Sequence, residues 1–339
     1  MKMRISNLVL ILMMLGFFSC SDDNKDTGDS EPEEVTLTFN VETNEDQMGV
    51  FSHHKMAIFN GEVWSVGGYN SYHTSIHNDV WKSADGRAWA SHASEQFPKR
   101  RDHSLTVFDN KMWVIGGFTE SSPDTFTALS DVLYSSDGST WTLATDNPID
   151  GASIGSHATV VFNNKLYIIK DGSNEDASGC TVWSSSDGVN WTRKTNNAFS
   201  YREGFSMAVF NNEIYVFGGF HESTYFNEIW KSDDGIDWTR VNTIGGAFPS
   251  RAYGETVVYN NKLWVFGGTN GTTSTGLGLH YSNDGIQWER YLPLPSEDGL
   301  QHFSALCYDD AIWVFGGMQQ EEGSDLTTRV GTINTIKQD

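Results

Sequence analysis

The chain has 339 residues, of which 38% are hydrophobic and 13% aromatic, with 33 glycines but only 7 prolines. This composition is typical of many short strands joined by tight turns, and it favours an all-β protein. The formal net charge of −22 argues against nucleic-acid partners and against binding to anionic headgroups, because both require clustered Lys and Arg.

The first 19 residues have the pattern of a signal peptide. Lys2 and Arg4 precede an apolar run from Leu8 to Phe18, which is too short to span a bilayer and has the length of a signal-peptide core. A small residue then precedes Cys20, and this arrangement resembles the bacterial lipobox. The resemblance implies that Cys20 is lipidated and becomes the new N-terminus; an ordinary secretory signal is the alternative.

Residues 20–34 are polar and acidic, with almost no side chain that could enter a core. We expect a flexible tether there. The sequence Ser-Asp-Asp at 21–23 is similar to the export tag that follows the lipidated cysteine in surface-displayed Bacteroidetes lipoproteins. This resemblance implies an outer-membrane lipoprotein that is exposed on the cell surface and attached to the membrane through its lipid.

Two motifs then recur in phase. The first is Ser-x-Asp-Gly-x-x-Trp, which ends five times, at Trp89, Trp141, Trp191, Trp238 and Trp288. The second is a hydrophobic strand ending in Gly-Gly, with its first glycine at Gly67, Gly116, Gly218, Gly267 and Gly316, and a decayed copy at 167–172. A period of about 50 residues with several short strands per repeat predicts a β-propeller built from four-stranded blades.

Residues 35–339 are therefore interpreted as one six-bladed propeller. In the second repeat the strands are expected at 104–108, 111–115, 131–135 and 141–143. The sixth repeat has too few outer strands of its own, since only 327–337 remains to form one. We expect the alternating segment 35–41 to complete that blade, because an open sheet edge promotes aggregation.

The repeated motifs resemble those of the Kelch family and of the galactose oxidase central domain, through the Gly-Gly strands, the later aromatic and tryptophan pairs and the Arg-x-x-His sequence ending at His103. The Asp-Gly-Trp turn is also similar to the Asp-box of sialidases, in which it is structural. Copper chemistry of the galactose oxidase type is not expected, because Cys180 and Cys307 do not fit its cysteine-linked tyrosine. No metal and no cofactor are predicted, and the two cysteines fall in blades too far apart for a disulfide.

Repetition separates structural residues from functional candidates. Five equivalent aspartates in hairpin turns indicate turn stabilisation, and His54, His103 and His157 are interpreted as recurring packing residues for the same reason. The two hairpin turns of each blade share one face. The longer connections, which vary between blades, share the other face, where we expect the binding site.

Candidate site residues lie on this variable face. Three arginines fall sixteen residues before Gly-Gly, where they either converge on the central opening and attract an anion or brace the blades. The loop aromatics either bind a ligand or merely cover the blade tops. The full candidate set is Arg100, Arg101, Arg202, Glu203, Arg251, Tyr253, His302, Tyr69, Phe118, Phe220 and His221.

Aromatic faces with scattered His, Arg and carboxylates suit a sugar or a peptide. We therefore expect a binding module for a glycan or protein ligand. The alternative is a sugar enzyme, because the chain is similar in fold to the bacterial sialic acid mutarotase. An epimerase of that type would need an acid and a base near the mouth, for which Glu203 with Arg202 or His302 is the candidate set.

Overall fold

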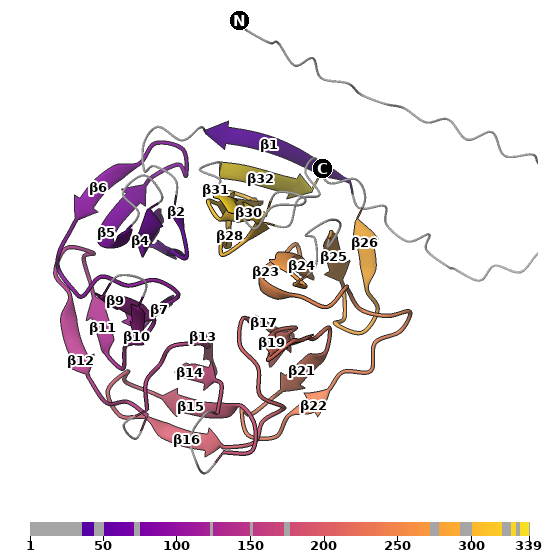
Figure 1. The fold of residues 1–339 in the computed structure, drawn as a ribbon. Coiled ribbons are helices and arrows are strands. Elements are labelled where there is room, and N and C mark those ends of the chain that lie inside the picture. Colours follow the sequence, from indigo (N-terminus) through magenta and orange to yellow (C-terminus); the bar gives the residue numbers. More distant parts are fainter. Residues whose placement is uncertain are drawn as a thin grey trace, which may run out of the picture. The chain divides into compact units, whose positions relative to one another are not determined.

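The computed structural model describes residues 36–43, 51–70, 75–122, 125–149, 152–172, 177–271, 278–291, 300–320, 327–329 and 333–338. Thr36–Asp339 forms one compact unit, a ring of six antiparallel blades around a central axis (Figure 1). The predicted signal peptide, Cys20 and tether lie outside the described residues. The described residues contain no helix that is long and apolar enough to cross a membrane.

Each blade contains four strands, ordered from the axis outward. Blade one consists of β3 (Lys55–Phe59), β4 (Glu62–Asn70), β5 (Ser75–Ser83) and β6 (Ala90–Ala93). Blade two consists of β7 (Ser104–Phe108), β8 (Lys111–Ile115), β11 (Val132–Ser135) and β12 (Thr142–Thr145). Blade three consists of β13 (His157–Phe162), β14 (Lys165–Lys170), β15 (Thr181–Ser185) and β16 (Thr192–Thr195). Blade four consists of β17 (Ser206–Phe210), β18 (Glu213–Phe217), β21 (Ile229–Ser232) and β22 (Thr239–Arg240). Blade five consists of β23 (Ala252–Tyr259), β24 (Lys262–Thr269), β25 (Leu279–Ser282) and β26 (Glu289–Tyr291). Blade six consists of β28 (Ser304–Tyr308), β29 (Ala311–Phe315), β32 (Ile333–Gln338) and β1 (Leu37–Thr43).

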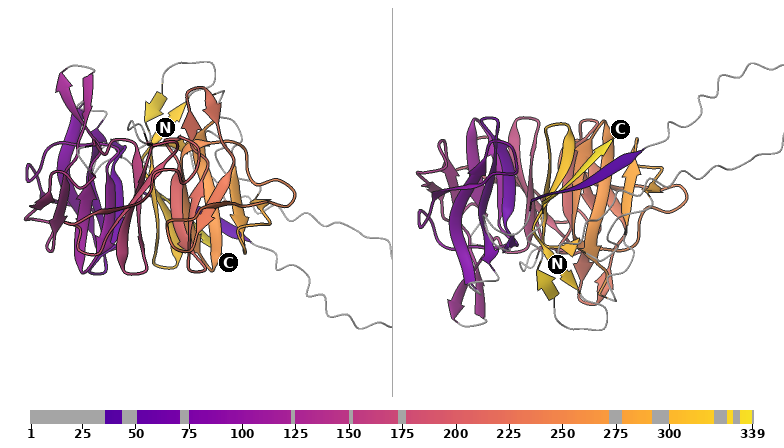
Figure 2. Two further views of the ribbon diagram at one scale, coloured as in Figure 1. Left: turned by 90° about the horizontal axis from the view of Figure 1, so that it is seen from below. Right: turned by 90° about the horizontal axis from the view of Figure 1, so that it is seen from above.

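Shorter strands extend the connections between the second and third strands of a blade and those between blades. They are β2 (Phe51–Ser52) beside β4, the pair β9 (Phe118–Ser122) and β10 (Thr125–Ala128), the pair β19 (Phe220–His221) and β20 (Thr224–Tyr225), and the group β27 (Leu300–Gln301), β30 (Met318–Gln320) and β31 (Thr327–Arg329). Figure 2 shows the β9–β10 hairpin projecting from one face of the ring. The strand positions expected in the second repeat are confirmed to within two residues.

The ring closes with strands from both ends of the propeller, as predicted. β1 pairs antiparallel with β32, from Leu37 opposite Gln338 to Thr43 opposite Ile333. The expectation of one strand over 327–337 is wrong in detail. β31 turns away to pair with β30 in a separate small sheet, and only β32 enters blade six.

The repeated Asp-Gly-Trp turn is structural. In blade one, Asp85 Oδ1 accepts hydrogen bonds from the backbone N–H groups of Arg87 and Ala88, each at 2.8 Å. The Trp89 indole N–H donates to the Gly86 carbonyl at 3.1 Å. The aspartates of the other four boxes accept the same pair of backbone bonds, which explains why the motif recurs.

The glycine of each box is required because an aromatic ring from the preceding blade lies against it. A Cβ on Gly188, whose φ is +74°, would lie 2.1 Å from Cζ3 of Trp113 in blade two. Trp113 is itself buried and belongs to an apolar cluster that spans blades two and three. The inter-blade core therefore fixes both the turn and the spacing of the blades.

Both cysteines of the propeller are free thiols, as expected. Cys180 is buried, and burial raises the pKa of its thiol to about 12. Cys307 is only half-buried, and burial raises its pKa to about 12 as well.

Candidate functional site at the propeller axis

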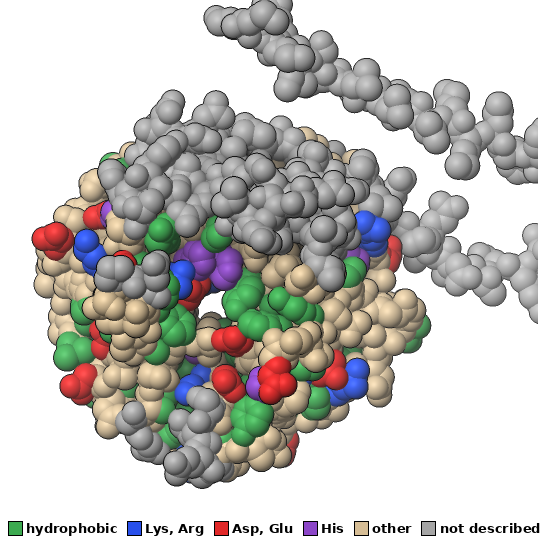
Figure 3. All heavy atoms as spheres, viewed as in Figure 1, with side chains coloured by type: hydrophobic (Ala, Val, Ile, Leu, Met, Phe, Trp, Pro, Cys, Tyr) green, Lys and Arg blue, Asp and Glu red, His purple; other side chains and the backbone are tan. Residues whose placement is uncertain are grey.

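A polar cavity of about 650 Å³ lies at the axis and is lined by residues from all six blades. This volume falls within the range of small-molecule sites in proteins, about 300–1,000 Å³. Figure 3 shows histidine, acidic and basic side chains gathered around the central opening. The cavity is therefore the first place to look for a ligand.

The rim of the cavity is built from one position that recurs in the blades, fourteen residues before the first glycine of Gly-Gly. Five of these residues have left-handed backbones, with φ between 52° and 64°: His53, Asp102, Gly204, Tyr253 and His302. Left-handed backbone costs a residue with a Cβ roughly 1–2 kcal/mol. Such conformations persist where the surrounding structure enforces them, and they concentrate at functional sites.

Main-chain hydrogen bonds enforce this conformation. Tyr253 N donates to Gly204 O at 2.7 Å, and His302 N donates to Tyr253 O at 3.3 Å. His53 N continues the chain to His302 O at 2.8 Å, and Asp102 N continues it to His53 O at 3.0 Å. The rim is thus a belt of backbone bonds running from blade to blade, which presents its side chains in fixed positions.

Aromatic rings line one side of this rim. The Tyr253 ring stacks on His302 with centroids 4.3 Å apart, and His302 stacks on His53 at 3.9 Å. Phe220 supports Tyr253 from the outside at 5.5 Å. Burial and then the nearby Glu203 carboxylate raise the pKa of Tyr253 above its usual range, so its hydroxyl stays protonated and can donate a hydrogen bond.

Charged groups occupy the neighbouring part of the rim. The Asp102 carboxylate lies 3.6 Å from Nδ1 of His302 and 3.7 Å from Nε of Arg101. Burial alone would raise the pKa of Asp102, but the attraction of His53, His302 and Arg101 lowers it well below its usual range. The Arg101 guanidinium stacks on Phe126 at 3.9 Å, which holds it at the cavity wall.

Glu203 supplies a second carboxylate to the cavity. Its backbone pairs with Phe220 in an isolated bridge, and its Oε2 accepts a hydrogen bond from Ser156 Oγ of the preceding blade. The cavity therefore contains Glu203 and Asp102 on different blades, with Arg101 as a cation. This set can hold the hydroxyl groups of a polar ligand by both donating and accepting hydrogen bonds.

Deeper in the cavity, Lys55 of blade one and Glu255 of blade five form an ion pair at 2.9 Å, although blade six lies between them in the ring. Burial lowers the pKa of Lys55, but the pairing with Glu255 outweighs this effect and raises it. Lys55 therefore stays charged at neutral pH, and the ion pair ties the inner strands of blades one and five together.

The three recurring histidines are neutral side chains of the cavity wall, in agreement with a packing role. Burial lowers the pKa of His54 to about 3 and that of His157 to about 4, and it lowers that of His103 well below its usual range. His157 contacts Ser104 Oγ at 3.0 Å. Both ring nitrogens of His54 and of His103 are buried without a protein hydrogen-bond partner. Buried polar atoms of this kind are normally satisfied by water or a ligand.

The structure brings some of the predicted site residues together in the cavity and leaves others out. Five of the predicted residues line the cavity: Arg101, Phe118, Glu203, Tyr253 and His302. Tyr69 lies in the extension of β4 opposite Ser52, and Phe220 and His221 form the short strand β19. These three lie outside the cavity lining, and Phe220 reaches it only through Tyr253.

The expectation that three arginines converge on the opening is wrong, and the alternative of a brace describes them. Arg100 and Arg202 have no exposed surface, and Arg251 is 3% exposed. Each donates to the carbonyl of the first glycine of Gly-Gly in its own blade, at 3.0, 3.1 and 3.0 Å. Each guanidinium also packs over the phenylalanine three residues earlier in the chain, which explains the repeated Phe-x-x-Arg pattern.

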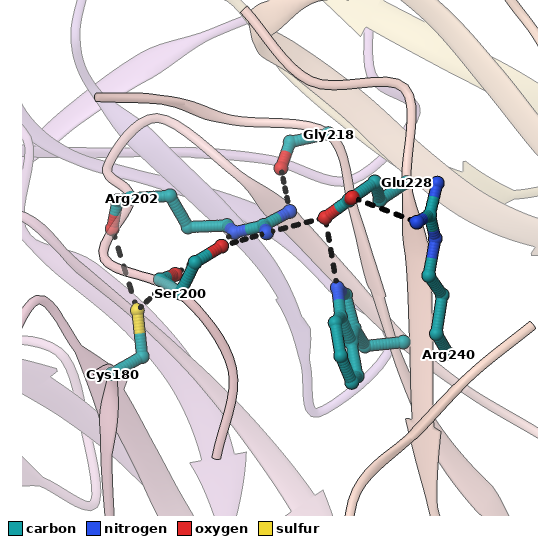
Figure 4. Close-up of polar contacts among 7 residues, drawn as sticks. Cys180, Ser200, Arg202, Gly218, Glu228 and Arg240 are labelled. Carbon is teal, nitrogen blue, oxygen red and sulfur yellow. Dashed lines mark hydrogen bonds and ion pairs between the residues drawn. The ribbon is translucent and has the colours of Figure 1, made fainter. Parts of the chain in front are cut away.

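Acidic partners complete two of these braces. Arg100 binds Asp131 through two hydrogen bonds, of 2.8 and 2.7 Å. Arg202 binds Glu228 Oε2 at 2.7 Å, and the other oxygen of Glu228 lies 3.2 Å from the exposed Arg240 (Figure 4). Arg251 instead faces His280 Nδ1 at 3.4 Å. Arg202 therefore cannot contact a ligand in the cavity, and Arg101 is the arginine that can.

Sequence reasoning missed His53, Asp102, Phe126 and the Lys55–Glu255 pair. His53 and Asp102 stand at the same repeat position as Tyr253 and His302, so aligning the residue fourteen positions before each Gly-Gly could have found them. The ion pair joins residues two hundred positions apart, and no local pattern connects them.

Fold and cavity together define a six-bladed β-propeller with a polar axial cavity. Residues 173–317 match the family model described as the KLHDC2/KLHL20/DRC7 Kelch-repeats domain. The solved structure of YjhT is similar in fold, with a TM-score of 0.65 and 14% sequence identity, over 85% of this chain and 95% of that one. None of the curated proteins compared with the chain matches it significantly.

Proposed function

We propose that the protein is a surface-exposed lipoprotein that binds a glycan in its axial cavity. One observation carries this proposal: the residues that break the repeat, among them Arg101, Glu203, Tyr253 and His302, line one cavity of about 650 Å³. The stacked Tyr253 and His302 rings offer a surface for the apolar face of a sugar. Arg101, Glu203 and Asp102 offer partners for its hydroxyl groups.

The cavity favours a glycan over a folded protein ligand. A specific protein interface buries about 1,200–2,000 Å² in total, mostly over a broad surface. In this propeller the distinctive groups face inward at the axis, where a chain end or a few sugar units can reach them. A protein ligand would instead have to bind through the loops around the rim.

A glycan array followed by calorimetry tests this proposal. Glu203→Gln is expected to weaken binding of the best array ligand by roughly tenfold or more, because a charged hydrogen-bond acceptor in the cavity is lost. Glu222→Gln, a change at an exposed glutamate of the β19–β20 turn, should leave the affinity unchanged. If both variants bind as the unchanged protein does, the ligand does not occupy the cavity.

The lipid anchor is tested separately. We expect Cys20 to carry the lipid, so Cys20→Ala should release the protein from the membrane fraction and remove the mass of the acyl chains from its N-terminal peptide. A variant that remains acylated and bound to the membrane would contradict the proposed anchor.

A second candidate function is a mutarotase or epimerase, and the pairing of groups in the cavity favours it. Glu203 can act as a base, and His302, whose Nδ1 lies 3.6 Å from Asp102 Oδ1, as an acid. Arg202 is excluded from this set because its guanidinium is bound to Glu228. Exchange NMR of reducing sugars distinguishes the two functions: binding without faster anomer exchange rejects the enzyme.

A further inference from the structure

We propose that the cavity rim binds a divalent transition-metal ion, with Zn²⁺ as the representative, through His53, Asp102 and His302. One potential ligand atom of each residue lies within 4.8 Å of those of the other two. This proposal revises the expectation of a chain without metal. It goes beyond glycan binding and does not depend on it.

The fold holds the three residues in place. They occupy the same repeat position in three consecutive blades, six, one and two, and their φ angles are 53°, 59° and 52°. Two backbone bonds connect them directly, from His53 N to His302 O at 2.8 Å and from Asp102 N to His53 O at 3.0 Å. A site with a fixed backbone loses little conformational freedom when it binds an ion.

The spacing of the side chains fits a metal after a small adjustment. The separation of 3.6 Å between Asp102 Oδ1 and His302 Nδ1 is close to the roughly 3.3 Å between ligand atoms that tetrahedral zinc requires. The His53 and His302 rings are stacked with their centroids 3.9 Å apart, so both imidazoles lie beside the Asp102 carboxylate. Ser52 Oγ lies 2.9 Å from His53 Nδ1 and orients that ring, as outer partners of ligating histidines do.

The chemistry of the set indicates the class of ion. Two imidazoles with one carboxylate suit Zn²⁺ and neighbouring transition metals, whereas Mg²⁺ and Ca²⁺ prefer oxygen ligands only. Three protein ligands leave a coordination position, and all three residues line the cavity. The Arg101 guanidinium, 3.7 Å from Asp102, opposes a second cation and should lower the affinity.

Titration calorimetry with ZnCl₂ on the untagged protein tests the site, and visible absorption of the Co²⁺-loaded protein reports its geometry. Asp102→Asn and His302→Asn are suitable variants, because asparagine also adopts left-handed backbone. Each should weaken Zn²⁺ binding by roughly 100-fold or more, since a ligand is lost, and Ser52→Ala by about tenfold. His221→Ala, a change at an exposed histidine outside the cavity, serves as the control.

The expected result is one Zn²⁺ per chain, with affinity retained in the His221 variant and lost in the two ligand variants. Circular dichroism of each variant, and the smaller effect of Ser52→Ala, separate loss of a ligand from loss of the fold. No binding by the unchanged protein would overturn the proposal. Equal affinity in the His302→Asn variant would do so as well, by placing the ion elsewhere.

Discussion

The brace around Glu228 allows a sharp test, because two arginines contact the same carboxylate from different environments. The Arg202 side chain is fully buried and bonds Oε2 at 2.7 Å, whereas the Arg240 side chain is 57% exposed and lies 3.2 Å from Oε1. Removing one partner of a buried ion pair costs about 3–5 kcal/mol, and an exposed pair contributes about 1 kcal/mol or less. We therefore expect Arg202→Met to destabilise the protein several times more than Arg240→Met.

Thermal and urea unfolding, followed by tryptophan fluorescence, measures this difference. For a unit of this size about 2 °C of Tm corresponds to 1 kcal/mol, so Arg202→Met should lower Tm by roughly 6–10 °C and Arg240→Met by about 2 °C or less. Equal losses would refute the reasoning. So would a stable Arg202→Met variant that loses ligand affinity, since Arg202 would then act in the site.

The pH dependence of this difference has a definite sign. The contacts with Arg202 and Trp230 lower the pKa of Glu228 in the folded protein, although burial alone would raise it. A lowered folded pKa stabilises the protein above the unfolded value, about 4.3, and the effect is lost as the pH falls below it. The stability gap between the unchanged protein and Arg202→Met should therefore shrink below about pH 4.

The repeated turns and the thiols allow three more tests. Gly188→Ala should lower the free energy of unfolding by about 2–5 kcal/mol, through left-handed strain plus the contact with the Trp113 ring. Gly61→Ala, at a similar φ of +79° but with nothing within 4 Å, should lower it by only about 1–2 kcal/mol. Equal losses in urea unfolding would contradict the packing argument. Backbone hydrogen bonds lower the pKa of Asp187 to about 2 although burial opposes them, so acid titration should show stability lost between about pH 4 and pH 2, and Asp187→Asn should reduce that loss. Alkylation at pH 8, mapped by peptide mass spectrometry, should leave Cys180 unmodified until denaturant is added, because the pKa of its thiol is raised to about 12; rapid labelling of the folded protein would contradict this.

The sequence predicts most of the fold because the repeated motifs act through short-range contacts. The Asp-Gly turns, the Gly-Gly strands and the tryptophans each act within a blade or on its neighbour, and the structure places them as the repeat implies. The Phe-x-x-Arg pattern is compatible with both a brace and an anion site. Its spacing of sixteen residues to Gly-Gly is explained by the direct contact from guanidinium to carbonyl.

The site is harder to predict because it is assembled across the axis. Tyr253 and His302 stand out as departures from the repeat, but the stacking of His302 on His53 depends on how blade six meets blade one. Loop aromatics present a different difficulty. Tyr69 and Phe118 both follow Gly-Gly, and only the direction of each connection decides that Phe118 enters the cavity.

The pairing of β1 with β32 also constrains how the protein can reach its folded state. Leu37 meets Gln338, so one of the earliest strands to emerge during synthesis or export has no partner until the last one arrives. Blade six must then be the final blade to assemble, since closing the longest loop in the chain is entropically the most costly step. Until β1 pairs with it, the edge of β32 is open to any equivalent strand. At high concentration, β1 of a second copy competes for this edge. Strand-exchanged dimers are therefore the expected misfolded product of this architecture.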